Sequence, residues 1–261
     1  MEAPGFSSRL SPLERWLLVV PLLGGATFGV LPLLASPAIA GLFGYTGNDA
    51  YVYRIAGAAS LGYAFALLPG INDGRWLPLR NVVVAVLAFN VVSILATLVE
   101  VAQGKGTPIL FLITAASVAI VAITVPLLAR HERVPPGGDQ APYSIAILVL
   151  ATVAALFFGV AFFLPELDAK LFGYLGTDTY LWRQAGAATF GYGVMGIAEL
   201  RAPRWEAMRL PTIMGLAFNF VSFLASVFEL LRNPTLLAAV VGPASFLFSI
   251  AFIVGMARRG R

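Results

Sequence analysis

Residues 41 to 100 of the chain are repeated at residues 170 to 229. When the two segments are aligned at a constant offset of 129 positions, about 26 of the 60 residue pairs are identical. Repetition of this length indicates two copies of one structural unit, because unrelated apolar segments would share far fewer positions. The repeated positions include ionisable residues, which are costly inside a membrane and are therefore candidate structural or functional groups.

The chain is too apolar for a water-soluble domain. Hydrophobic residues make up 59% of it and charged residues 11%, against about 45–50% and about 25% in soluble domains. Eight apolar stretches have roughly the 20 residues that span a bilayer, and we predict an all-α integral membrane protein with eight transmembrane helices, four in each copy. They lie at about residues 16–35, 51–69, 81–101, 108–129, 143–164, 180–198, 210–231 and 235–257.

We expect the first stretch to be a retained helix rather than a cleaved signal. Its Phe28-Gly29-Val30 is matched by Phe158-Gly159-Val160 in the fifth stretch, which lies in mid-chain. A secretory signal is an N-terminal segment that is removed, so a mid-chain counterpart favours a structural helix.

The basic residues predict the orientation. With eight spans, both termini and the even-numbered connections share one side of the membrane, and an excess of arginine marks the cytoplasmic side. The side with the termini carries Arg9, Arg15, Arg75, Arg80, Arg130, Arg133, Arg201, Arg204, Arg209, Arg258, Arg259 and Arg261. The other side carries Arg54, Lys105, Lys170, Arg183 and Arg232. We therefore expect a multi-pass protein of a bacterial plasma (inner) membrane with both termini in the cytoplasm.

The even number of spans in each copy predicts the relation between the copies. Both copies then have the same orientation, as two four-helix bundles related by a pseudo-two-fold axis along the membrane normal. A polar stretch rich in proline and glycine separates them. We expect a first repeat at residues 1–134, a cytoplasmic linker at 135–142 and a second repeat at 143–261.

Missing residue types restrict the chemistry. The chain has no cysteine, which excludes thiol redox relays and cysteine-ligated iron–sulfur clusters. Its one histidine, His131, lies next to the linker and is expected to be a solvated loop residue. We predict no catalytic residue, metal or cofactor. The arginines are spread over short loops and form no basic face, so nucleic acid is not an expected partner.

Polar residues form a stripe in the third and seventh expected spans. In the third, Asn90, Ser93, Thr97 and Glu100 have the spacing of one helix face, and the stripe is about 15 Å long. Its counterpart consists of Asn219, Ser222, Ser226 and Glu229. The stripe is expected to run from mid-membrane to the extracytoplasmic end.

Two arginines lie at nearly the depth of these glutamates. Because a lone charge in a bilayer is normally paired, we expect one ion pair between Arg54 and Glu100 and one between Arg183 and Glu229. An extracytoplasmic loop motif precedes each arginine, and its aspartates are expected to cap or charge-match the N-termini of the following helices. The motif comprises Tyr45, Asp49 and Tyr51 in the first copy and Tyr174, Asp178 and Tyr180 in the second.

The four-span unit has a family resemblance. Arg54 to Gly62 and Arg183 to Gly191 each contain an arginine followed by Gly-Ala-Ala and further small residues. This pattern and the helix count resemble the DoxX-like group of small bacterial four-helix membrane proteins, here duplicated in tandem. The resemblance implies a four-helix bundle. Some members are linked to quinone-dependent sulfur oxidation, but the chain has no cysteine, so only the bundle is carried over.

Three functional hypotheses remain open. The leading one is a non-enzymatic accessory or scaffolding subunit, whose partners are the lipid bilayer and other membrane-protein subunits. In it the polar groups are structural staples between helices. The alternative is a carrier or binding protein for a lipid or another small amphipathic or anionic ligand, held in an extracytoplasmic-facing cleft. A quinone-linked membrane oxidoreductase comes last, because arginine-paired carboxylates stay ionised and are poor general acids.

Overall fold

A computed structural model of the chain describes residues 8–34, 49–136, 142–173 and 178–259. Within these ranges the protein is all-α, with eight helices of 22 to 28 residues, one short helix and no β-strand. The helices are α1 (Pro12–Leu34), α3 (Ala50–Asp73), α4 (Trp76–Ala102), α5 (Pro108–Arg130), α6 (Pro142–Phe163), α7 (Pro165–Phe172), α8 (Thr179–Arg201), α9 (Trp205–Arg232) and α10 (Leu236–Arg259). Each expected apolar stretch coincides with one long helix. The short α7 was not predicted.

Seven of the long helices in the described ranges are long and apolar enough to cross a membrane. The exception is α8, which has 23 residues but contains Arg183, Gln184 and Glu199. Most of the side chains on α8 are buried by other helices, so its polar groups are not presented to lipid. The chain is therefore a helical, multi-pass membrane protein.

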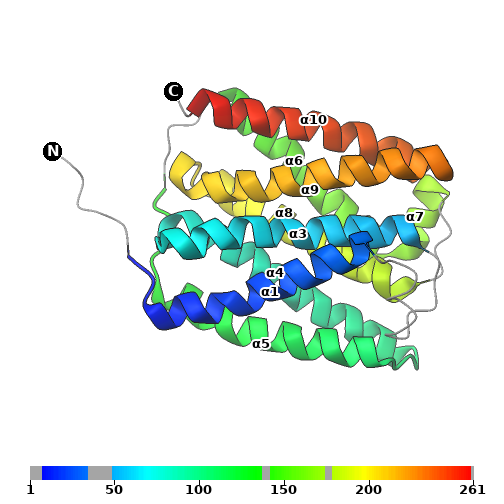
Figure 1. Cartoon of the computed structure of the whole chain (residues 1–261), viewed down its shortest axis with the longest axis horizontal. Coiled ribbons are helices and arrows are strands. Elements are labelled where there is room, and N and C mark those ends of the chain that lie inside the picture. Colours follow the sequence, from blue (N-terminus) through cyan, green and yellow to red (C-terminus); the bar gives the residue numbers. More distant parts are fainter. Residues whose placement is uncertain (1–7, 35–48, 137–141, 174–177, 260–261) are drawn as a thin grey trace.

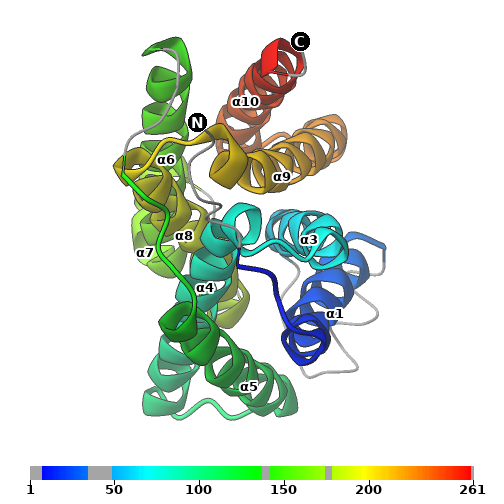
Figure 2. The same ribbon diagram turned by 90° about the vertical axis from the view of Figure 1, so that its left-hand side faces the viewer.

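The long helices run roughly along one axis (Figure 1). We call the end where α1 begins and α10 ends the terminal end, and the opposite end the Glu100 end. Figure 2 looks at the terminal end and shows α3, α4, α8 and α9 toward the middle, with α1, α5, α6 and α10 outside them. For brevity, α1 to α5 form the first half of the molecule and α6 to α10 the second half.

The central helices pack across the two halves. α3 lies on α1 of its own half and on α9 of the other, and α8 lies on α6 and on α4. By contrast, α3 touches its sequence neighbour α4 much less, and α8 touches α9 less still. The middle of the molecule is therefore one interface built from both halves, which the prediction of two four-helix bundles did not include.

Two glycines allow these helices to cross closely. A Cβ added at Gly62 on α3 would lie 2.8 Å from the Met214 carbonyl oxygen of α9 and would collide with the Tyr192 hydroxyl. A Cβ at Gly191 on α8 would lie 2.8 Å from the Ala85 carbonyl oxygen of α4 and would collide with Tyr63. Small residues of this kind let helix backbones approach each other.

The two tyrosines at these crossings each bond to the other half. The Tyr63 hydroxyl donates to the Ala188 carbonyl oxygen at 2.8 Å, and Tyr192 donates to Ala59 at 2.8 Å. Their rings meet edge to face, with centroids 5.1 Å apart. Both hydroxyl groups are therefore engaged at the helix crossings.

The terminal end is closed by a small polar cluster. The Leu10 amide donates to the Gly74 carbonyl oxygen at 2.9 Å, so the start of the described chain is bound to the turn between α3 and α4. The His131 Nε2 atom lies 3.0 Å from a Glu14 carboxylate oxygen, and its ring stacks on Trp76 with centroids 4.7 Å apart. The expectation of a solvated His131 is therefore wrong, because α1, α4 and α5 meet at this point.

Candidate functional site

The two arginines pair with glutamates of the opposite half. Arg183 on α8 forms an ion pair with Glu100 on α4, and Arg54 Nη1 on α3 lies 3.5 Å from Glu229 Oε2 on α9. The expected partners, Glu100 for Arg54 and Glu229 for Arg183, were wrong. The reason is lateral packing: each arginine helix lies against the glutamate helix of the other half, and both glutamates are at the same depth.

Glu100 is the most heavily bonded of these groups. Its carboxylate is 1% exposed and also accepts a hydrogen bond from the Thr179 hydroxyl at 2.7 Å and pairs with Lys105 Nζ at 3.0 Å. Two cations and a hydroxyl therefore surround a single buried carboxylate. Arrangements of this kind compensate the cost of taking a charge out of water.

The polar stripes lie in packed interfaces. Ser93 donates to the Gln184 side chain at 2.7 Å, and the Thr97 and Tyr180 hydroxyls are 3.1 Å apart. In the second stripe the Ser226 and Tyr51 hydroxyls are 2.8 Å apart, which is the equivalent contact at an offset of 129. The Ser222 hydroxyl is buried and has no hydrogen-bond partner in the described part of the chain.

The residues of the predicted loop motif do not form one loop in the part of the chain that the structure describes. Tyr45 and Tyr174 lie outside the described residues. Tyr51 and Tyr180 are in the first turns of α3 and α8 and are buried, so they belong to helices rather than to a loop.

The two aspartates of the motif have different roles. Asp178 caps α8 as expected, by accepting from the Leu181 amide at 3.0 Å, and burial raises its pKa to about 6. Asp49 instead accepts from the Asp178 amide at 2.8 Å and from Trp182 Nε1 at 3.2 Å, both in the other half. Asp49 is at the N-cap position of α3, where it can match the charge of the helix N-terminus, but its side chain makes no capping hydrogen bond to that helix.

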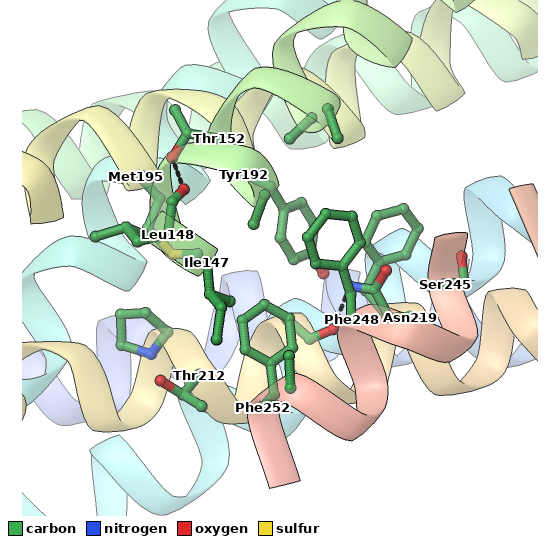
Figure 3. Close-up of a pocket in the computed structure, with 18 of the residues that line it drawn as sticks. Ile147, Leu148, Thr152, Tyr192, Met195, Thr212, Asn219, Ser245, Phe248 and Phe252 are labelled. Carbon is green, nitrogen blue, oxygen red and sulfur yellow. Dashed lines mark hydrogen bonds between the residues drawn. The ribbon is translucent and has the colours of Figure 1, made fainter. Parts of the chain in front are cut away.

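A cavity of about 300 Å³ lies among α6, α8, α9 and α10, and we call it the second-half cavity. Most of its lining is apolar or aromatic, and Figure 3 shows Ile147, Thr212 and Phe252 directed toward one another. The apolar part includes Phe158, Met195, Phe218, Phe248 and Phe252, and the polar part includes Thr152, Thr189, Glu199, Thr212 and Asn219.

A smaller cavity of about 180 Å³ occupies the equivalent place among α1, α3, α4 and α5, and we call it the first-half cavity. Its lining repeats that of the larger cavity at an offset of 129: Ser60 for Thr189, Tyr63 for Tyr192, Phe89 for Phe218 and Asn90 for Asn219. Of the eight residues expected to form a polar cleft or ion pairs, Asn90 and Asn219 line these cavities. Arg54, Ser93, Glu100, Arg183, Ser222 and Glu229 line neither.

Sequence reasoning did not identify the cavities. They depend on small side chains at the lining, such as Ala116 and Ala244, which look the same in an apolar sequence whether they pack tightly or leave space. Glu199 was also not predicted, because it is not among the positions that the two copies share. Its counterpart at an offset of 129 is Gly70.

One buried acid lies outside both cavities. Asp168 on α7 has no exposed surface, neither of its carboxylate oxygens has a hydrogen-bond partner among the described residues, and burial raises its pKa to about 7. In the unfolded chain this carboxyl group has the ordinary pKa of about 4. Between about pH 4 and pH 7 the folded protein therefore holds a proton that the unfolded chain has released.

We expect Asp168→Asn to remove a pH dependence of stability. Stability falls as pH rises wherever the folded state binds more protons, so the ionised carboxylate destabilises the wild type fully above about pH 7. The variant should have a higher thermal midpoint at about pH 8 and nearly the same midpoint at about pH 4. Intrinsic tryptophan fluorescence in detergent measures both. Glu166→Gln, at an exposed position of the same helix, is the control and should show no such change.

Within the described residues, no cluster of three or more histidine or acidic side chains could hold a metal ion. Comparisons of the chain with protein-family models, curated proteins and solved structures found no match. The resemblance to the DoxX-like group stays a prediction, and function must be argued from the molecule itself.

Proposed function

We propose that the protein is a membrane-embedded binding protein for a small amphipathic molecule, held in the second-half cavity. The observation that carries this proposal is the cavity itself, with a volume of about 300 Å³ and an apolar, aromatic lining into which a few polar side chains converge. Small-molecule sites in proteins have this size and composition. This site is inside a helix bundle and differs from the expected extracytoplasmic cleft.

The membrane arrangement is part of the proposal. We count α8 as a span in addition to the seven apolar helices, which makes eight. Its polar residues are compatible with a membrane because α4 and α6 cover α8 and separate these residues from lipid. The excess of twelve basic residues over five supports cytoplasmic termini in a bacterial inner membrane. The matched tyrosine and glycine contacts at the helix crossings support a pseudo-two-fold axis along the membrane normal.

The binding hypothesis is preferred over the accessory-subunit hypothesis for a specific reason. The exposed apolar side chains of α5 and α10 are those that a bilayer would also cover, so they favour no protein partner. The arginines that would have bound an anion are engaged with glutamates. The described lining of the two cavities contains no histidine or cysteine, and it adds nothing in favour of the oxidoreductase hypothesis.

We expect Ala244→Trp to displace the ligand by filling the second-half cavity. Ala244 lines that cavity on α10, and Ala116 lines the first-half cavity on α5, so Ala116→Trp is a control with the same substitution in the other cavity. Native mass spectrometry of protein extracted gently from its own membrane should show a small molecule bound to the wild type and to the Ala116 variant. The Ala244 variant should lose it while keeping the wild-type circular dichroism. Unchanged occupancy in a folded Ala244 variant would refute the proposal.

A further inference from the structure

Glu199 is a buried acid directed to the second-half cavity. It lies near the end of α8, is 4% exposed and belongs to the cavity lining. In the described part of the chain, no hydrogen bond or ion pair reaches its carboxyl group. The other charged residue of the lining, Arg258, is exposed at the end of α10 and already has an interaction partner. A buried carboxyl group is normally paired or hydrogen-bonded, so Glu199 lacks a partner that a ligand would supply.

Four of the polar side chains that line the cavity donate hydrogen bonds within their own helices. Thr152, Thr189 and Thr212 each donate their hydroxyl proton to the main-chain carbonyl one turn earlier, at 2.7 or 2.8 Å. Asn219 uses its amide nitrogen in the same way, at 2.8 Å. The three threonines therefore have only lone pairs on oxygen left, and Asn219 keeps its amide oxygen and one N–H group. A ligand that satisfies the threonines must bring donors.

Aromatic rings complete the environment. Phe218, Phe248, Phe252 and Trp205 line the cavity with Glu199. Ring faces attract cations, with Trp the strongest. A carboxyl group, a set of acceptors and several rings in one cavity all favour a cationic donor.

The first-half cavity is formed by the equivalent helices, but its described lining contains no residue equivalent to Glu199. Gly70 occupies the position equivalent to Glu199, and a side chain there would collide with Leu79. The carboxyl group is therefore no part of the repeated framework. A structural role shared by both halves does not explain it.

We infer that the ligand of the second-half cavity is a lipophilic amine, whose protonated amino group binds Glu199 while its apolar body packs along Met195, Phe248 and Phe252. This inference rests on the proposed function and names the chemical class of its ligand. It also predicts that the first-half cavity does not select for amines, because it has no acid to pair with them.

Photoaffinity labelling of the whole purified protein in a neutral maltoside detergent tests the inference. Three probes share one diazirine-bearing long alkyl chain and end in a primary amine, an alcohol or a carboxylic acid. Labelled peptides are mapped by mass spectrometry. We expect the amine to label α6 and α10 about tenfold more than the alcohol, because hydrogen bonds to charged groups are the stronger ones. Glu199→Gln should reduce amine labelling to the alcohol level, and Arg258→Gln should not reduce it.

The outcomes separate the inference from the proposed function. If all three probes label the second-half cavity equally and Ala244→Trp abolishes all three, the binding function stands and the amine inference fails. If the folded Glu199→Gln variant keeps the preference for the amine, the inference also fails. If Ala244→Trp changes no labelling, the binding function itself fails. Labelling of the first-half cavity by the three probes without preference agrees with the inference.

Discussion

Replacing Glu100 with alanine should lower the free energy of unfolding by about 3–5 kcal/mol, which is the range for removing one partner of a buried ion pair. Arg183 would then be a buried cation with no carboxylate, and Thr179 and Lys105 would also lose an acceptor. Unfolding in mixed micelles, followed by tryptophan fluorescence, measures the loss. Glu229→Ala is the matched control and should cost less, because Arg54 is more exposed and also lies over the Phe228 ring at 4.5 Å.

Charge exchange tests which residues are partners. Arg54→Glu combined with Glu229→Arg restores an opposite-charge pair between α3 and α9, so this double variant should recover part of the stability that each single variant loses. Arg54→Glu combined with Glu100→Arg places the new charges on helices that touch little, and its losses should add. Recovery in the second double variant, but not in the first, would contradict the crossed pairing.

Division of the chain after residue 138 should prevent either segment from folding by itself. Neither half has a core of its own, because α3 is covered by α9, and α8 is covered by α4. We expect residues 1–138 or 139–261 expressed alone to be degraded or aggregated. Co-expressed, the two segments should insert and purify together as one complex. Affinity capture through a tag on one segment measures this.

A stable, monomeric first half would contradict the conclusion that α3 depends on α9, and α4 on α8, for its packing. A second division, after residue 104 between α4 and α5, also separates α3 and α4 from α8 and α9. The segment 105–261 would keep α8 and α9 but lack α1, α3 and α4. Recovery of a native complex in both cases would show that the connections are dispensable, whereas the central contacts are not.

The sequence predicted where the helices lie along the chain better than it predicted which helices pack against each other. Apolar runs locate the long helices within a few residues, because each run must cover a bilayer. The depth of Arg54 and Glu229 also follows from position along each helix. Depth alone does not say which helix lies beside which, so both ion pairs were assigned to the wrong partners and the contacts of Asp49 with the second half were not predicted. That information lies in the helix crossings at Gly62 and Gly191, which require three-dimensional packing.

The candidate site was predictable only in part. Asn90 and Asn219 were identified from their repeated, helical spacing, and both line a cavity. Glu199 lies in the same helix as Arg183 but breaks the repeat, since Gly70 replaces it in the first half. A comparison of the copies that looked for differences, rather than identities, would have marked this acid. The volume of the cavity depends on side-chain packing and has no signal in the sequence.

The crossed ion pairs have a consequence for the history of the chain. A single four-helix unit with the same contacts would place its arginine against the glutamate of a second identical unit, and so would assemble as a two-fold homodimer. In such a homodimer every substitution appears twice, and both cavities must carry the same residues. Fusion of two units into one chain removes that constraint. The two halves of this chain can therefore differ at equivalent positions, as they do at Gly70 and Glu199, and under the proposed function only one of them binds an amine.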